Sequence, residues 1–176
     1  MTLLSVDPGS SKMGYGIHDG DKLVHWGIVT PHSDRKTFNN QMNDKMQQVL
    51  WEFGPLFKKY EIDQVAWEIV PVQTMGQRDL IQSCLSTIKS LTFLNACTYV
   101  GLTPMQMKKL VTGDSKASKG EIREAVFAHF PEFPVIDQLP WDVYDGIAVG
   151  IAAKKLRLRD WWPAVSNDVT RSYSGA

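Results

Sequence analysis

Apolar and polar residues at the start of the chain follow patterns typical of a β-sheet. An apolar run at 3–6 ends on Asp7, and a Pro-Gly pair after it predicts a tight turn before a second strand at 15–17. An Asp-Gly pair then separates this strand from the apolar segment 23–29, and Asp-Gly between two apolar runs is typical of a β-hairpin. We therefore predict three strands in an antiparallel meander.

From residue 38 the apolar residues recur at steps of three and four, which predicts an amphipathic helix to about residue 60. Gly54-Pro55 is expected to break or kink this helix. The next apolar segment, 65–70, predicts a fourth strand, and it carries Glu68 near its end. A second acidic residue is thus expected at the end of a buried strand.

A long helix is predicted to follow, to about Ala96, because Thr74 and Gln77 match a capping box and apolar residues then recur at helical spacing. The remaining expected elements are a short fifth strand at 99–102, a brief helix from 103, a helix opened by a capping box at 118–121 that stops before 131, and a last helix over 141–153. The predicted fold class is α/β: a mixed five-stranded sheet, made of the antiparallel meander plus two further strands, flanked by helices.

The length of 176 residues, of which 43% are hydrophobic, predicts one globular domain over 1–159 and a C-terminal tail over 160–176. No leader pattern and no uninterrupted run of about 18 apolar residues is present, so we expect a cytoplasmic protein of a bacterial cell or a phage-infected host. Cys84 and Cys97 fall in the predicted long helix about 20 Å apart, too far to form a disulfide.

Positive charge is local rather than global, because 19 basic residues balance 19 acidic ones. The segment 108–123 concentrates cations against few acids, and we expect it to bind phosphate through Lys108, Lys109, Lys116, Lys119 and Arg123. An ordinary solvated surface is the alternative. A second basic run at 154–159 is either a flanking contact or the solvated end of the last helix, where cations oppose the dipole favourably.

Two more carboxylates belong to the last predicted helix, where Asp142 and Asp145 are three residues apart and share a face. Gly146 and other small residues continue that face and would let the helix approach the sheet closely. The four acids, Asp7, Glu68, Asp142 and Asp145, would then converge at one point. The alternatives are that Asp7 caps its turn and that the helical pair complements the helix dipole.

Carboxylates without clustered His or Cys suit Mg²⁺, which prefers hard oxygen ligands. We expect two Mg²⁺ ions per active site, with Mn²⁺ as a substitute, and direct attack by water that leaves a 5′-phosphate. The four histidines, at 18, 25, 32 and 129, lack metal-binding spacing and are predicted to be structural.

An ordered set of motifs resembles the RuvC-type Holliday junction resolvases. The set comprises Val6-Asp7-Pro8-Gly9-Ser10 through Gly14-Tyr15-Gly16, Glu68 closing the fourth strand, the run from Lys108 to Gly113 followed by Lys116-Ala117-Ser118-Lys119, and Trp141-Asp142-Val143-Tyr144-Asp145-Gly146. The resemblance implies a ribonuclease H-like fold, a homodimer and Mg²⁺-dependent symmetric nicking of four-way DNA junctions. By position, the four acids match the family's catalytic set, and Lys108 and Lys119 match its DNA-contacting lysines.

Two departures from that family lead to further expectations. The segment 69–72 has no aromatic residue where the family commonly places one after the catalytic glutamate, and the net charge is zero. We therefore expect shallow discrimination among junction sequences, as in a divergent or phage-encoded member. For the dimer we expect Ile81 and Leu85 to face the sheet and Ile88 or Leu91 to face a partner.

Other functions remain alternatives to junction cleavage. An actin-like or sugar-kinase ATPase needs two domains of this kind, and the chain is too short for that. A junction-binding module without cleavage would be expected to lack one of the acids. A ribonuclease H-like nuclease acting on flaps, other branched DNA or RNA–DNA hybrids stays open.

Overall fold

The computed structural model describes residues 1–70, 75–136, 138–157 and 160–163. Its elements, in chain order, are β1 (Thr2–Asp7), β2 (Met13–Asp19), β3 (Lys22–Val29), α1 (Phe38–Lys59), β4 (Gln64–Glu68), α2 (Met75–Leu94), β5 (Thr98–Leu102), α3 (Pro104–Thr112), α4 (Lys119–His129) and α5 (Trp141–Lys154). Every predicted strand and helix is therefore present. No helix in this part of the chain is long and apolar enough to cross a membrane.

The strands form one mixed sheet in the order β3-β2-β1-β4-β5. β1, β2 and β3 pair antiparallel, whereas β4 pairs parallel to both β1 and β5, which confirms the predicted meander with two added strands. Gly20 in the hairpin has a φ of 51°, the left-handed conformation that a short hairpin turn requires and that glycine adopts without strain.

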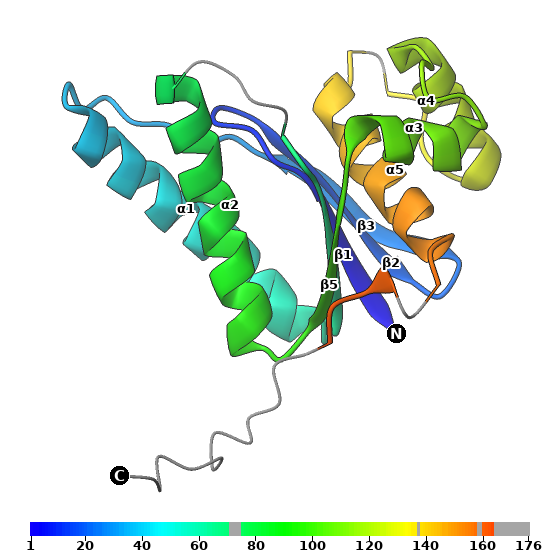
Figure 1. Cartoon of the computed structure of the whole chain (residues 1–176), viewed down its shortest axis with the longest axis horizontal. Helices are drawn as coiled ribbons and strands as arrows, with labels where there is room; N and C mark the ends of the chain where they lie inside the picture. The colour runs from blue at the N-terminus through cyan, green and yellow to red at the C-terminus, as the bar shows by residue number, and fades with distance from the viewer. Residues whose placement is uncertain (71–74, 137, 158–159, 164–176) are drawn as a thin grey trace, which may run out of the picture.

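Helices cover both faces of the sheet: α1 and α2 lie on one side, and α3, α4 and α5 on the other (Figure 1). The core is correspondingly divided into two clusters. Leu3 and Ala66 belong to the cluster under α5, while Leu4 and Trp67 belong to the cluster under α1 and α2, as the alternation of side chains along a strand demands. Burial on both faces explains why β1 and β4 are nearly continuous apolar runs.

α1 continues through Pro55, so a break at Gly54-Pro55 is wrong, while the kink stays a prediction. The missing N–H of a proline costs one helical hydrogen bond. Phe53 and Phe57, on either side of Pro55, are buried in the core, and this packing holds the helix in one piece.

α2 ends at Leu94, slightly before the predicted end, and Ala96 takes a φ of 53° in the turn toward β5. Cys97 therefore lies outside the helix, contrary to expectation, although both cysteines are free and buried. Thr74 of the predicted capping box lies outside the described residues.

The apolar residues of α2 are intramolecular core. Ile81, Leu85, Ile88 and Leu91 are all buried, so the expectation that Ile88 or Leu91 faces a partner is wrong. The reason is that α1 packs along α2 and covers the side that the sheet leaves open.

The end of the described chain contacts the edge strand of the sheet. Trp162 exchanges two backbone hydrogen bonds with Tyr99 of β5, and the two rings stack with centroids 6.3 Å apart. A Trp contact was expected here, while the boundary of the domain at 159 stays a prediction because 164–176 lie outside the described residues.

Candidate active site

Asp7 and Glu68 end two neighbouring parallel strands. The β1–β4 register pairs Val6 with Trp67, so the next residue of each strand, Asp7 and Glu68, lies at the same edge of the sheet. Both project toward α5, because Leu3 and Ala66 lie on that face at even spacing before them. The predicted placement of two carboxylates at strand ends is therefore what the structure has.

The first turn of α5 is held directly against β2 at a pair of glycines. A Cβ on Gly14 would come within 1.6 Å of the carbonyl oxygen of Asp142, and a Cβ on Gly146 would lie 2.4 Å from the carbonyl carbon of Gly14. Gly14 also lies opposite Asp7 in the β1–β2 register. Contact between the two backbones thus brings the first turn of α5 beside Asp7.

The close approach at Gly146 agrees with the prediction that small residues bring this helix near the sheet. The matching role of Gly14 was missed by the sequence reasoning. A signal for it exists, since glycine inside a strand often marks close approach of another backbone, and Gly14 and Gly16 both lie inside β2.

The pKa values of the acids indicate that these side chains lie close together. The pKa of Asp7 is raised to about 8, first by burial and then by the negative charges of Glu68, Asp145 and Asp142. The pKa of Glu68 is raised to about 7 by burial and by Asp145. That of Asp145 is also raised, by burial foremost, with Lys119 opposing the shift. The negative charges of the other three acids thus all reach Asp7, and the site concentrates negative charge in partly buried surroundings.

The donor set fits a hard divalent cation. In the conformations seen, no three His, Cys, Asp or Glu side chains among the described residues are close enough together to hold a metal ion. The acids are nevertheless near enough to raise one another's pKa, and all their donor atoms are carboxylate oxygens, the ligands that Mg²⁺ prefers. A bound cation would offset the electrostatic repulsion between these carboxylates, which water screens only weakly because they are partly buried.

Lys119 supplies positive charge to the site. Its Nζ lies 3.5 Å from Oδ2 of Asp145, whose side chain is only 16% exposed. Lys119 is the first residue of α4, and the predicted capping box is present there: the Glu121 N–H donates to the Ser118 hydroxyl, and the Ser118 N–H donates to the Glu121 carboxylate. The capping box therefore fixes the start of α4 and, with it, the position of Lys119.

The other predicted phosphate-binding residues fall into two groups. Lys108, on α3, lies close enough to lower the pKa of both Glu68 and Asp145. By contrast, Lys109 Nζ donates to the Gly113 carbonyl oxygen at 2.6 Å, and Lys116 is exposed in the loop after α3.

Arg123 is placed differently again. Its guanidinium lies 5.6 Å from the ring centroids of Phe127 and Tyr144. The structure thus brings Lys108 and Lys119 to the acids, Arg123 to aromatic rings beside them, and Lys109 and Lys116 to neither.

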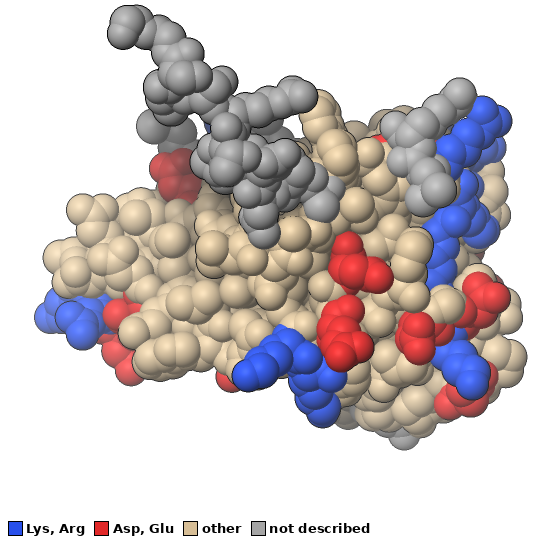
Figure 2. All heavy atoms as spheres, turned by 90° about the horizontal axis from the view of Figure 1, so that it is seen from below, with Lys and Arg blue, Asp and Glu red and all other residues tan. Residues whose placement is uncertain are grey.

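The second basic run is only partly described. Lys155 Nζ donates to the Leu110 carbonyl oxygen at 2.6 Å, and 158–159 lie outside the described residues. At the end of the molecule where the N-terminus lies, basic side chains form a band along the right edge of the view, and most acidic side chains lie nearer the middle of a largely uncharged surface (Figure 2).

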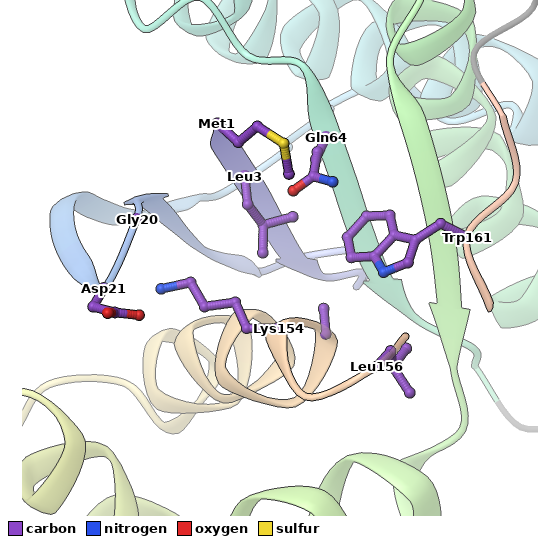
Figure 3. A pocket seen from close by; sticks show the side chains of 9 residues that line it. Met1, Leu3, Gly20, Asp21, Gln64, Lys154, Leu156 and Trp161 are labelled. Atoms are coloured by element: carbon purple, nitrogen blue, oxygen red, sulfur yellow. The ribbon is translucent and has the colours of Figure 1, made fainter. Parts of the chain in front are cut away.

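Lys154 points into a cavity of about 280 Å³ between the β2–β3 hairpin and the end of α5 (Figure 3). Met1 and Gln64, at the starts of β1 and β4, also line this cavity, so it lies at the opposite end of the sheet from Asp7 and Glu68. It is therefore separate from the acidic site.

Three of the four histidines pack against other rings, in agreement with a structural role, whereas His32 is exposed with its Nε2 2.7 Å from Oδ1 of Asp34. His18 is fully buried with Nε2 3.0 Å from the Ser5 hydroxyl, and burial lowers its pKa to about 3. His25 stacks on Tyr60. His129 lies in the last turn of α4 rather than in a loop.

Known proteins are similar to this chain in both sequence and fold. The family described as "Crossover junction endodeoxyribonuclease RuvC" matches residues 3–153. Curated relatives of that name include the protein of Sulfurovum sp., 30% identical over 156 residues, which are 86% of this chain and 93% of the relative. The protein of Nitratiruptor sp. is 27% identical over 165 residues, which are 90% of this chain and 99% of the relative.

Solved structures agree on the fold. The structure described as T. thermophilus RuvC in complex with Holliday junction substrate has a TM-score of 0.74 at 19% identity, covering 93% of this chain and 99% of that one. The yeast mitochondrial Holliday junction resolvase Ydc2 has a TM-score of 0.60 at 11% identity, covering 85% of this chain and 77% of that one. The expected ribonuclease H-like fold is confirmed. The chain belongs to the RuvC family of crossover junction endodeoxyribonucleases.

Proposed function

We propose that this protein resolves four-way DNA junctions by paired symmetric nicks, and that Asp7, Glu68, Asp142 and Asp145 carry the reaction at each site. The observation that supports this most strongly is that the pKa of Asp7 is raised by the negative charges of the other three partly buried carboxylates, which are brought together from β1, β4 and α5. The Thermus thermophilus relative was solved with a Holliday junction substrate, which supports the same choice of substrate.

The carboxylates would hold two Mg²⁺ ions, or Mn²⁺ in their place. When bound, such a pair lowers the pKa of an attacking water and stabilises the leaving 3′ oxygen, which leaves a 5′-phosphate. Asp7 ends the central strand, next to Glu68 and beside the first turn of α5, so its carboxylate would be a ligand of these ions. Glu68, Asp142 and Asp145 complete the ligands from either side.

The lysines beside the acids have two tasks in this proposal. Without metal, Lys119 partly neutralises Asp145, as their 3.5 Å separation indicates. With metal and DNA bound, Lys119 and Lys108 are free to turn to the phosphates that flank the cleaved bond. A bound cation would take over from Lys119 as the positive charge beside Asp145, so the lysine could turn to the DNA without leaving that carboxylate unpaired.

Symmetric nicks on opposite strands need two sites related by a two-fold axis, so we propose a homodimer. The α1–α2 face is the surface we assign to it. Leu50, Trp51 and Leu94 are exposed there, and a groove of about 540 Å³ runs between the two helices. Exposed apolar residues grouped on one face are typical of an interface.

A side-by-side cleavage assay tests the proposal. Four-way junctions, flaps, linear duplexes and RNA–DNA hybrids are incubated with the protein in Mg²⁺. We expect paired nicks in the junction and little cleavage elsewhere. Faster cleavage of flaps or hybrids would show that one of these, and not the four-way junction, is the preferred substrate. The cytoplasm of a bacterial cell or phage-infected host is where we propose that the enzyme meets its DNA.

A further inference from the structure

A partly exposed indole borders the acidic site. Trp141 is the first residue of α5 and immediately precedes Asp142, yet 42% of it is exposed. It lies one helical turn before both Tyr144 and Asp145, and helical side chains lean toward the N-terminus of their helix. The indole therefore extends to the outer rim of the site, beyond the carboxylates.

The Trp141 ring packs against Tyr144. Its centroid lies 6.0 Å from that of Tyr144, with the planes at 51°. Tyr144 is buried and packs against Phe127 and Phe133, with centroids 5.9 and 5.8 Å away. A fixed aromatic cluster thus holds the indole while leaving part of it uncovered, which lowers the entropy lost when a planar group stacks on it.

The segment that precedes α5 in the chain also exposes apolar side chains. Val135 is 73% exposed and Ile136 39% exposed in the connection that leads from α4 into α5. Water-exposed apolar side chains gathered beside a polar site are typical of a binding surface.

Cations alternate with these rings. Lys119 and Arg123 are four residues apart and share a face of α4. Lys119 lies at Asp145, and the Arg123 guanidinium lies 5.6 Å from the Tyr144 ring. Positive groups interleaved with aromatic rings are what proteins use to bind nucleic-acid strands, the cations for phosphates and the rings for bases.

We propose that Trp141 is a substrate-positioning residue whose indole stacks on a base next to the cleaved phosphate, so that this base leaves the regular stack of its strand. The inference rests on the proposed function. Lys119 and Arg123 neutralise the adjoining phosphates, and the stacked base fixes the strand in front of the four acids.

Three substitutions separate stacking from packing. Trp141→Ala removes the ring, Trp141→Leu keeps an apolar contact with Tyr144 but has no π-face, and Trp141→Phe keeps a smaller ring. Each is made in an Asp7→Asn background so that junctions remain uncut in Mg²⁺. The matched control is Trp162→Ala, since Trp162 is 64% exposed and pairs with Tyr99 near the start of β5, at the far end of the sheet.

Stacking predicts that the Ala and Leu variants bind a four-way junction roughly 5- to 150-fold more weakly, while Phe and the control stay within about threefold of the parent. Equal affinities of the Leu and Phe variants for the junction would overturn the inference. Junction cleavage by the wild-type protein is measured separately and tests the proposed function.

Discussion

Gly14 and Asp142 touch through their backbones, so closely that a Cβ on Gly14 would lie 1.6 Å from the Asp142 carbonyl oxygen. Gly14 is also the register partner of Asp7. One backbone contact between β2 and α5 therefore sets the separation of the strand acid from the helix acids. The position of the acids depends on a residue that has no side chain of its own to contribute.

Replacing that glycine should separate the acids. We expect Gly14→Ala to push α5 away from β2, to lower the free energy of unfolding by roughly 1–3 kcal/mol, as overpacking does, and to slow cleavage at least tenfold. Urea unfolding and junction cleavage in Mg²⁺ measure the two effects.

Gly54→Ala is the matched control, because a Cβ on Gly54 in α1 meets nothing within 4 Å. This variant should be as stable as the wild type or more stable by up to about 1 kcal/mol, with unchanged cleavage. Cleavage at the wild-type rate by Gly14→Ala would show that the backbone contact does not position the acids.

The acids should make the metal-free protein less stable at high pH. Folding raises the pKa of Asp7 from its ordinary value of 3.8 to about 8, so the folded state binds more protons between these values and stability falls as pH rises through them. Asp7→Asn removes this penalty. Thermal unfolding in a metal chelator should give a melting temperature for Asp7→Asn that exceeds the wild-type value at pH 8, by at least about 2 °C.

The same comparison at pH 5 should show a smaller difference, because Asp7 is then largely protonated in the folded wild type. Asp34→Asn, at an exposed position, is the control and should shift neither value. A wild-type protein that becomes more stable between pH 5 and pH 8, relative to Asp7→Asn, would contradict the buried, mutually repelling acids.

Most of the secondary structure could be predicted because periodicity and capping act locally. The capping box at Ser118 and the Asp-Gly hairpin depend on a few adjacent residues, and both are present. Two residues of the acidic site, Asp7 and Glu68, could be predicted in the same way, because each is a carboxylate that directly follows an apolar run.

What the sequence did not reveal depends on contacts between distant segments. α1 passes through Pro55 because Phe53 and Phe57 pack in the core, and a local rule for proline does not include that packing. Ile88 is buried because α1 covers the second side of α2. Arg123 lies on Tyr144, 21 positions further along the chain, and no spacing rule within a helix connects them.

Lys108 and Lys119 should bind DNA through its backbone. Lys108→Ala and Lys119→Ala are each expected to weaken junction binding about equally for different junction sequences, and to lower the slope of log affinity against log salt by about one unit per lost contact. Binding titrations at several salt concentrations on several junctions measure both quantities.

Lys58→Ala, an exposed cation on α1, is the control and should leave the slope unchanged. If the Lys108→Ala, Lys119→Ala double variant keeps the wild-type slope, the DNA-binding face lies elsewhere, and the basic run at 154–159 becomes the next candidate.

The α1–α2 face should hold the dimer together. Leu94 is 81% exposed on α2, and Leu94→Asp would place a charge in the proposed interface, where an unpaired buried charge is costly. Light scattering at micromolar concentration should give a dimer for the wild type and a monomer for Leu94→Asp. Met105→Asp, at a 63% exposed position on α3, should remain a dimer. A monomeric wild type, with and without junction DNA, would exclude the proposed assembly.

The central claim, that four carboxylates carry metal-dependent junction cleavage, is tested most directly by the single-turnover cleavage rate of Asp7→Asn on a four-way junction in Mg²⁺. The substitution keeps the volume of the side chain and removes its charge, so folding and junction binding should persist while cleavage is lost. We expect a rate below about a tenth of the wild-type rate, equivalent to a barrier at least roughly 1.4 kcal/mol higher. A folded, junction-binding Asp7→Asn protein that cleaves faster than this would show that the Asp7 carboxylate does not carry the reaction.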